Sequence, residues 1–245
     1  LSPEAPVPVV TQERTVETVG GAGLVYENLK SLGVDVELFE YASKKCVKTR
    51  VMCDGHYVTR IDDDHYADGV EVCNTILRNN FSKYEYVILS DYNKGVLDES
   101  IKIIEHLNKF GCRVIVDPKS HAENYEGAWL VKPNEKEFQE YFLNWHGNII
   151  TTRAGKSVVA KIDNEVYEVD VDTVEVSDVT GAGDCFLAAF VYALTKDYNY
   201  KKAIELAVKG SRESVQHTGT YTLAVSDLEQ QRVVFTNGVF DILHK

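Results

Sequence analysis

The sequence has 245 residues, of which 44% are apolar and 26% are charged, enough to bury the core of one large domain or of two small ones. Its formal net charge of −12 excludes a surface built for nucleic acid or an anionic membrane, because such surfaces need clustered Lys and Arg. The longest apolar run, residues 185–194, is about half of the ~20 residues that a membrane-spanning helix needs. The five cysteines form no CxxC pair. We therefore expect one main cytosolic domain with reduced thiols, no signal peptide and no membrane-spanning segment.

Two features lie in the first quarter of the chain. A glycine cluster, residues 20–23 (GGAG), precedes a helical pattern that ends at Leu32 and Gly33. Residues 47–62 then join two β-rich runs through an Asp-Gly pair, a turn that tolerates positive φ. We predict a β-hairpin here, either as an antiparallel flap over a site or as the plain edge of a sheet.

The middle of the chain alternates between strand and helix patterns. Apolar runs at 86–91, 113–118 and 128–134 alternate with helix-period segments at 97–111 and 135–143. This rhythm predicts right-handed βαβ units. A second hairpin is expected at 157–170, and its second strand is expected to continue through residues 167–176. The predicted fold is α/β, a three-layer α/β/α sandwich with a mainly parallel sheet and a small antiparallel hairpin flap.

The most informative string is SDVTGAGDCF, residues 177–186, which opens a helix expected to continue through Leu194. Glycines let a ligand approach the backbone, and the unpaired amides of a helix's first turn carry about half a positive charge, so the string predicts an anion site. Asp184 lies in that turn, where a carboxylate can take a proton from a substrate hydroxyl as a phosphoryl group arrives on it. The alternative is a plain capped helix start, but the length of the string favours the functional interpretation.

This string closely resembles the carboxyl-side signature of the ribokinase-like carbohydrate kinases. The resemblance implies that the protein transfers phosphate from ATP to a sugar hydroxyl with Mg²⁺ present. In this family Asp184 would be the general base, and Gly181, Ala182 and Gly183 would form the anion hole. The earlier glycine cluster resembles the amino-side Gly-Gly motif, in which Gly20 and Gly21 would let the sugar approach the backbone.

Two more segments match the family in the same order. Residues 132–137 (KPNEKE) resemble its Asn-x-x-Glu motif, in which Asn134 and Glu137 would organise magnesium and phosphate, Glu137 through water. Residues 151–155 (TTRAG) resemble the loop that lies along the nucleotide. With the turn before the helix, these matches imply nucleotide-binding roles for Thr152, Arg153, Gly155 and Thr180.

A narrower resemblance points to the substrate. Residues 2–9, 47–51, 90–97 and 116–119 are similar to the kinase half of the bacterial bifunctional heptose 7-phosphate kinase/heptose 1-phosphate adenylyltransferases. This implies phosphorylation of the C1 hydroxyl of D-glycero-β-D-manno-heptose 7-phosphate to the 1,7-bisphosphate, a step toward ADP-heptose and the lipopolysaccharide core. It also suggests a homodimer through the hairpin flap. Another sugar or sugar-phosphate kinase of the family, or a non-catalytic sugar- or nucleotide-binding relative, stays open.

The phosphate of such a substrate would need cations in an otherwise acidic protein. Ammonium groups and the planar guanidinium suit that anion, and four residues of the matching strings could supply them: Lys48, Arg50, Lys94 and Lys119. For Lys119, a solvated surface position is an equally good interpretation. Asp91, in the string of residues 90–97, joins the implied substrate site.

The resemblance divides the chain into a kinase domain at 1–225, a polar linker at 226–231 and the truncated start of a nucleotidyltransferase domain at 232–245. Residues 235–244 (FTNGVFDILH) resemble the opening of the adenylyltransferase half and stop before the Gly-His of its His-x-Gly-His motif. The family's first strand, with an early substrate-binding aspartate, is expected to precede Leu1. Leu24 replaces the usual asparagine, and the intervals at 42–46 and 145–148 are shorter than in the family.

Two other sites are weighed and set aside. Residues 62–69 suggest a calcium loop, but Tyr66 and Thr75 stand where that loop needs an oxygen donor and a bidentate glutamate. Cys185 follows Asp184 but has no histidine nearby in sequence, so a small buried packing residue is the better interpretation.

Overall fold

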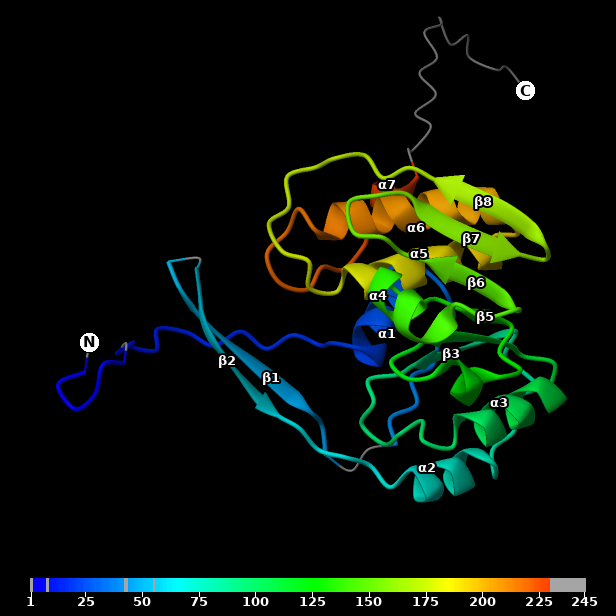
Figure 1. Ribbon diagram of the computed structural model, residues 1–245, viewed down its shortest axis with the longest axis horizontal. Helices are drawn as coiled ribbons and strands as arrows, with labels where there is room; N and C mark the ends of the chain where they lie inside the picture. The colour runs from blue at the N-terminus through cyan, green and yellow to red at the C-terminus, as the bar shows by residue number, and fades with distance from the viewer. Residues whose placement is uncertain (1, 8, 42–43, 55, 230–245) are drawn as a thin grey trace, which may run out of the picture.

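The structure is a computed structural model that describes residues 2–7, 9–41, 44–54 and 56–229 (Figure 1). The expected nucleotidyltransferase segment, 232–245, and residues 230 and 231 of the expected linker lie outside the described residues. Within them, no helix has the length and apolar character needed to cross a membrane.

Strands and helices alternate along most of the chain, as the sequence predicts. The strands are β1 (Val47–Cys53), β2 (His56–Asp63), β3 (Tyr86–Ser90), β4 (Arg113–Asp117), β5 (Leu130–Val131), β6 (Asn148–Thr151), β7 (Val158–Ile162) and β8 (Glu165–Val169). The helices are α1 (Ala22–Ser31), α2 (Gly69–Ile76), α3 (Ser100–Lys109), the 3-10 helix η1 (Ala122–Tyr125), α4 (Glu135–Glu137), the π-helix η2 (Phe138–Phe142), α5 (Ala182–Thr195), α6 (Tyr200–Ser214) and α7 (Val225–Leu228).

The main sheet has six strands in the order β3-β4-β5-β6-β7-β8. The first four are parallel to one another, and β7 and β8 continue the sheet as an antiparallel hairpin. Parallel strands end at the same edge of the sheet, so the loops after β3, β4, β5 and β6 gather there. This edge is where the polar motifs of the sequence meet.

Helices cover both faces of the sheet and bury a separate apolar cluster against each. Side chains of a strand alternate between the faces: Ile115 of β4 packs with α1, α5 and α6, whereas its neighbours Val114 and Val116 pack with α2 and α3. All three are fully buried. The predicted three-layer α/β/α sandwich is therefore confirmed.

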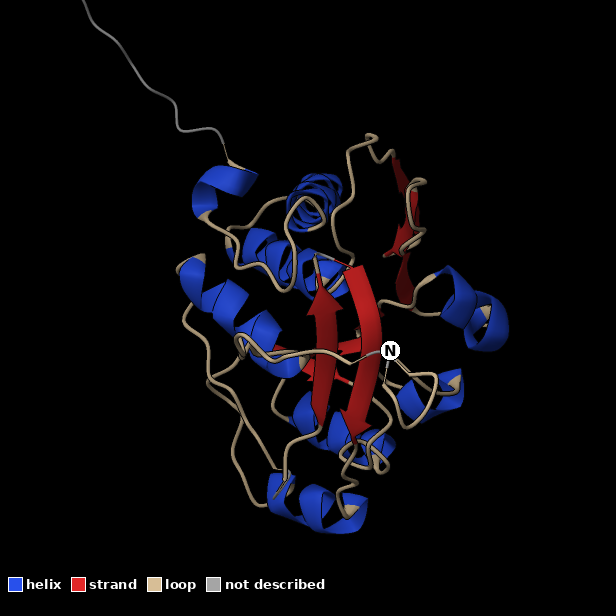
Figure 2. Ribbon diagram, turned by 90° about the vertical axis from the view of Figure 1, so that its left-hand side faces the viewer, coloured by secondary structure: helices blue, strands red, loops and turns tan. Residues whose placement is uncertain are grey.

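The β1–β2 hairpin is a small antiparallel sheet of its own, so the sheet-edge alternative is wrong for residues 47–62. It stands out from the body as an arm in Figure 1, and its two strands cross the front of the body in Figure 2. Lys48 and Arg50 share one face with their partners Asp62 and Arg60, because directly paired residues point to the same side.

Three local expectations need correction. The strand expected at 167–176 ends at Val169, because residues 170–176 pair with no other strand. The helix expected at 135–143 is one α-helical turn followed by the π-helix η2. The expected linker 226–231 begins inside α7, and Leu228 is buried in the core against α5 and α6.

Candidate active site

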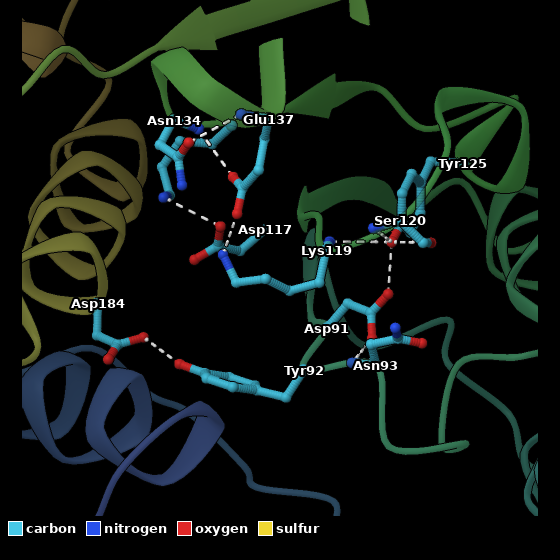
Figure 3. A network of polar contacts seen from close by, with 11 residues as sticks. Asp91, Tyr92, Asn93, Asp117, Lys119, Ser120, Tyr125, Asn134, Glu137 and Asp184 are labelled. Atoms are coloured by element: carbon cyan, nitrogen blue, oxygen red, sulfur yellow. Dashed lines mark hydrogen bonds and ion pairs between the residues drawn. The ribbon is translucent and has the colours of Figure 1, made fainter. Parts of the chain in front are cut away.

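Polar side chains converge where the carboxyl ends of β3, β4 and β5 meet the start of α5 (Figure 3). Asp91 follows β3, Asp117 ends β4, Lys132 follows β5, and Asp184 lies in the first turn of α5. The sequence string 177–186 and the strand ends, far apart in the chain, therefore form one site.

The turn before α5 is held open by a carboxylate and a glycine. Asp178 accepts hydrogen bonds from the Thr180 amide at 2.9 Å, the Thr180 hydroxyl at 2.8 Å and the Gly219 amide at 3.0 Å. Gly181 adopts φ 78°, and a Cβ there would come within 2.5 Å of Leu24 Cδ2. The turn thus needs glycine, and Asp178 and Thr180 build it. The Ala182 amide donates to the Val179 carbonyl oxygen at 3.3 Å, whereas the next amides, those of Gly183 and Asp184, stay available for an anion.

Asp184 is a buried carboxylate, with 8% of its surface exposed. Burial and the charge of Asp117 raise its pKa from 3.8 to about 6, against the opposing effects of Lys132, Tyr92 and Lys119. A carboxylate with a pKa near 6 is ionised at neutral pH and still accepts a proton more readily than an ordinary aspartate. Asp184 therefore has the position and the basicity of a general base.

Lys132 supplies a positive charge that the sequence analysis does not single out. Its ammonium lies 3.1 Å from Asp117 Oδ1, and both side chains are almost fully buried. It also lies 3.6 Å from where a Cβ on Gly183 would stand, so it flanks the first turn of α5. A lysine at the end of a buried strand, just before Pro-Asn, is the signal that could have revealed it.

Asn134 and Glu137 hold each other at the start of α4. The Glu137 amide donates to Asn134 Oδ1 and the Asn134 amide donates to Glu137 Oε2, both at 2.9 Å. Lys119 forms an ion pair with Glu137 Oε1. Burial lowers the pKa of Lys119, but the charges of Asp117 and Glu137 outweigh it and raise that pKa. Lys119 is thus tied to the Asn-x-x-Glu motif.

The expected nucleotide loop lies beside that motif. The Glu135 amide donates to the Thr152 carbonyl oxygen at 2.9 Å, which joins the loop to α4. Arg153 donates to Ser157 Oγ at 2.6 Å and pairs with Glu168 at 3.1 Å, so its guanidinium faces β8. Gly155 turns the chain with φ 65°.

The amino-side glycine cluster reaches the same place from α1. Gly21 caps α1 with φ 56°, and a Cβ there would stand 3.0 Å from Tyr92 Cε2. Nothing lies within 4 Å of the corresponding position on Gly20. Leu24, which replaces the family's asparagine, is 1% exposed and packs against Gly181, so it joins the two glycine turns through apolar contact.

The cations expected to meet a substrate phosphate fall into two places. Lys94 pairs with Asp64 at 2.6 Å, and the hydrogen bond from Lys94 and the charge of Lys48 both lower the pKa of Asp64. Hydrogen bonds from Thr180 and Gly219 outweigh burial and lower the pKa of Asp178, and the charge of Arg50 adds to this effect. Lys94 is thus neutralised by an acidic partner, whereas Arg50 stands exposed on the hairpin.

Asp91 anchors the loop that follows β3. Its Oδ1 accepts from the Asn93 amide at 2.7 Å, and its Oδ2 accepts from the Tyr125 hydroxyl. With both oxygens engaged, Asp91 fixes the backbone of residues 91–95.

Cys185 is fully buried, and burial raises the pKa of its thiol to about 12. It is a packing residue, as the sequence suggests, and not a nucleophile.

The residues present fit a nucleotide phosphate and Mg²⁺. An anion would meet the open amides of α5 together with Lys132 and Lys119. Asp117, Asn134 and Glu137 offer oxygen donors, and Mg²⁺ is commonly held by one or two carboxylates, water and substrate phosphates. Across the described residues, no group of three or more His, Cys, Asp or Glu side chains could hold a metal ion by itself.

The chain is similar in sequence to several known proteins. The sequence profile of the pfkB family carbohydrate kinases matches residues 25–227. The bifunctional protein HldE of a Nitratiruptor species is 28% identical over 324 aligned positions, which cover 100% of this chain and 70% of that protein. Other proteins of that name match at 27% to 30% identity. Because the alignment is longer than the chain, the Nitratiruptor protein has segments with no counterpart here.

Solved structures show the same fold. Phosphofructokinase-2 from Escherichia coli in complex with potassium has a TM-score of 0.66 and 17% identity, over 91% of each chain. A structure described as a ribokinase II from E. coli, in complex with ATP and Mg²⁺, has a TM-score of 0.62 and 16% identity, over 88% of this chain and 89% of that one. The ribokinase-like fold expected from the sequence is confirmed.

Proposed function

This chain belongs to the pfkB family of carbohydrate kinases, and we propose that it transfers the γ-phosphoryl group of ATP to the C1 hydroxyl of D-glycero-β-D-manno-heptose 7-phosphate. The observation that carries the kinase chemistry is the buried carboxylate of Asp184 at the open first turn of α5. The similarity to bifunctional proteins named HldE and the heptose-kinase-like strings support the choice of sugar.

In the proposed reaction Asp184 accepts the proton of the sugar hydroxyl while the sugar oxygen bonds to the γ-phosphorus. The bond from that phosphorus to the β–γ bridging oxygen breaks, and its electrons leave with ADP. The amides of Gly181, Ala182 and Gly183, with the ammonium of Lys132, stabilise negative charge on the transferring group; the Ala182 amide first has to leave the Val179 carbonyl oxygen, to which it donates at 3.3 Å. Mg²⁺, organised by Asn134 and by Glu137 through water, would neutralise charge on the phosphate oxygens.

The remaining assignments concern binding. The nucleotide would lie along the loop of residues 151–155, with Thr152, Arg153, Gly155 and Thr180 as contacts. The sugar would rest against Gly20 and Gly21, with Asp91 at the substrate site and its distal phosphate held by Lys48, Arg50 and Lys94. Support comes from Lys48 and Arg50, which lie on one face of the hairpin, and from the charge of Arg50, which helps to lower the pKa of Asp178.

The outer face of the hairpin supports a homodimer as part of this proposal. Val47 and Ile61 lie on the face opposite Lys48 and Arg50, and they are 50% and 59% exposed. A two-stranded hairpin is marginally stable alone in water, and a second copy would cover these side chains.

ADP release measured over a panel of phosphorylated and unphosphorylated sugars tests the substrate. We expect heptose 7-phosphate to have the highest kcat/KM. Turnover of another sugar with heptose 7-phosphate inert would favour the alternative, a different sugar kinase of the family. No turnover with any sugar, while ATP still binds, would favour a non-catalytic relative.

A further inference from the structure

Tyr92 stands between the two glycine turns of the site, and no motif in the sequence assigns it a role. Its hydroxyl donates to Asp184 Oδ1 at 3.2 Å, and its ring lies against the backbone of Gly21. In Figure 3 the ring points from the loop after β3 directly at Asp184. Among the described residues, it is the one side chain that hydrogen bonds to this carboxylate.

The backbone around Tyr92 is fixed, whereas its side chain can turn. Asp91 anchors the loop on one side, and on the other side Gly95 packs so tightly that a Cβ would come within 2.2 Å of the Ala67 carbonyl oxygen. Tyr92 itself is 41% exposed. Its ring can therefore rotate toward solvent without opening a cavity in the core.

The Tyr92 hydroxyl occupies a position built for a polar oxygen. Two residues earlier, at the end of β3, the Ser90 hydroxyl is buried without a hydrogen-bond partner within the described part of the chain. Burial and the charges of Asp184 and Asp117 raise the pKa of Tyr92, so its hydroxyl stays protonated and donates to Asp184. An unpaired buried hydroxyl is costly unless a ligand satisfies it.

An acceptor hydroxyl that approaches Asp184 from the side of Oδ1 takes the same position. A general base acts on a proton within hydrogen-bond reach, about 2.6 to 3.2 Å, so a sugar hydroxyl on this side of the carboxylate would replace the Tyr92 hydroxyl at Oδ1. Before the sugar arrives, a water molecule could fill the same place. Asp184 would take its proton, its oxygen would bond to the γ-phosphorus, and the bond to the β–γ bridging oxygen would break with its electrons leaving on the nucleoside diphosphate. The result is hydrolysis of the nucleoside triphosphate to diphosphate and phosphate.

We propose that Tyr92 is a positioning residue that occupies the general base until the sugar binds, and so suppresses hydrolysis of the nucleoside triphosphate by water. This inference rests on the proposed kinase chemistry at Asp184, but not on which sugar is the substrate. Sugar binding would displace the Tyr92 hydroxyl and turn its ring outward, leaving Asp184 Oδ1 to the acceptor hydroxyl.

The test is ATP hydrolysis by the full chain with Mg²⁺ and no sugar. Tyr92→Phe keeps the ring but removes the hydroxyl, so a water can reach Asp184. A general base contributes about 10²- to 10⁴-fold, and we expect sugar-independent hydrolysis to rise at least about tenfold, with an equal or larger rise in Tyr92→Ala. Adding Asp184→Asn to Tyr92→Phe should return the rate to the wild-type background.

Tyr167→Phe is the matched control, because the Tyr167 hydroxyl also donates to a carboxylate, that of Glu165. Both residues belong to β8, outside the site, so ATP hydrolysis by Tyr167→Phe should stay at the wild-type background. Unchanged hydrolysis in both Tyr92 variants, with normal circular dichroism and ATP binding, would overturn the inference, as would a rise that persists in the double variant. A rise that depends on Asp184 would support it even if heptose 7-phosphate is inert, an outcome that would contradict only the proposed substrate.

Discussion

At the scale of single residues, the ionised side chain of Asp184 lowers the free energy of unfolding of the protein. Its pKa rises from 3.8 to about 6 on folding, so the folded protein binds this proton more tightly than the unfolded chain. Its contribution to the free energy of unfolding therefore falls as the pH rises from about 4 to about 6, and stays low above that. The difference corresponds to ~3 kcal/mol at neutral pH.

This predicts that Asp184→Asn stabilises the ligand-free protein, and more strongly at pH 8 than at pH 5. The neutral amide keeps the shape of the side chain without a buried charge. Urea unfolding of both proteins at the two pH values measures the effect, with a gain of about 1 to 3 kcal/mol expected at pH 8. If the two proteins differ in stability by the same amount at pH 5 and at pH 8, Asp184 has an ordinary pKa. Stability is the cleaner readout, because a substrate phosphate also titrates near pH 6.

Glu137 is expected to act on magnesium, but its ion pair with Lys119 offers a competing structural role. Glu137→Gln should raise the magnesium concentration needed for half-maximal turnover, because it removes a negative charge that organises the metal's water. Lys119→Met breaks the same ion pair and leaves the carboxylate in place, so it is the control. If both variants shift the magnesium requirement equally, the ion pair is responsible and the metal role of Glu137 is contradicted.

How much of the site the sequence could predict depends on the kind of information each residue carries. Asp184 and the glycines around it belong to a contiguous string whose order implies a turn, a helix start and a carboxylate. Lys132 and Tyr92 act through tertiary placement: one ammonium is buried beside α5, and one ring lies over Gly21. The position of Lys132 just before Pro-Asn could have suggested its role, but no spacing within the sequence places the Tyr92 ring over Gly21.

At the scale of elements, the β1–β2 hairpin is expected to carry part of the substrate site. Arg50 lies on its polar face, and Lys94 follows β3. If both hold the substrate phosphate, Arg50→Ala or Lys94→Ala should weaken binding of the sugar phosphate about tenfold or more, since charge-assisted hydrogen bonds contribute about 1.5 to 3 kcal/mol each.

Isothermal titration with the sugar phosphate and with ATP separates binding from folding in these variants. Binding of ATP should change little. Equal weakening of both ligands would indicate a structural role instead, such as the ion pair between Lys94 and Asp64. Arg78→Ala is a suitable control, because this arginine follows α2 outside the described site and should leave both affinities unchanged.

Elements were predictable where local chemistry decides them. Both hairpins follow from Asp-Gly and Asp-Asn turns, and α5 follows from its glycine start and apolar run. The extension of β8 to residue 176 was wrong because alternation alone does not supply a neighbouring strand. The π-helix η2 was missed because its extra residue per turn leaves no mark in an apolar pattern.

At the scale of the whole molecule, the exposed face of the hairpin predicts association. Sedimentation velocity of the wild-type protein should show a dimer that dissociates on dilution. Ile61→Glu, which adds a charge to the outer face, should shift the population to monomers. Val166→Glu, a matched change at a 71% exposed side chain on β8, should not. A concentration-independent monomer in the wild type would contradict the homodimer.

The central claim joins a reaction to a residue: Asp184 takes the C1 hydroxyl proton of heptose 7-phosphate as the γ-phosphoryl group of ATP arrives. Single-turnover transfer, with the product followed by ³¹P NMR, tests both parts at once. Wild-type protein should form a phosphate ester at C1, and Asp184→Asn should bind ATP normally but transfer about 10²- to 10⁴-fold more slowly. A well-folded Asp184→Asn protein that transfers at a near-normal rate, or a wild-type product phosphorylated elsewhere on the sugar, would contradict the account.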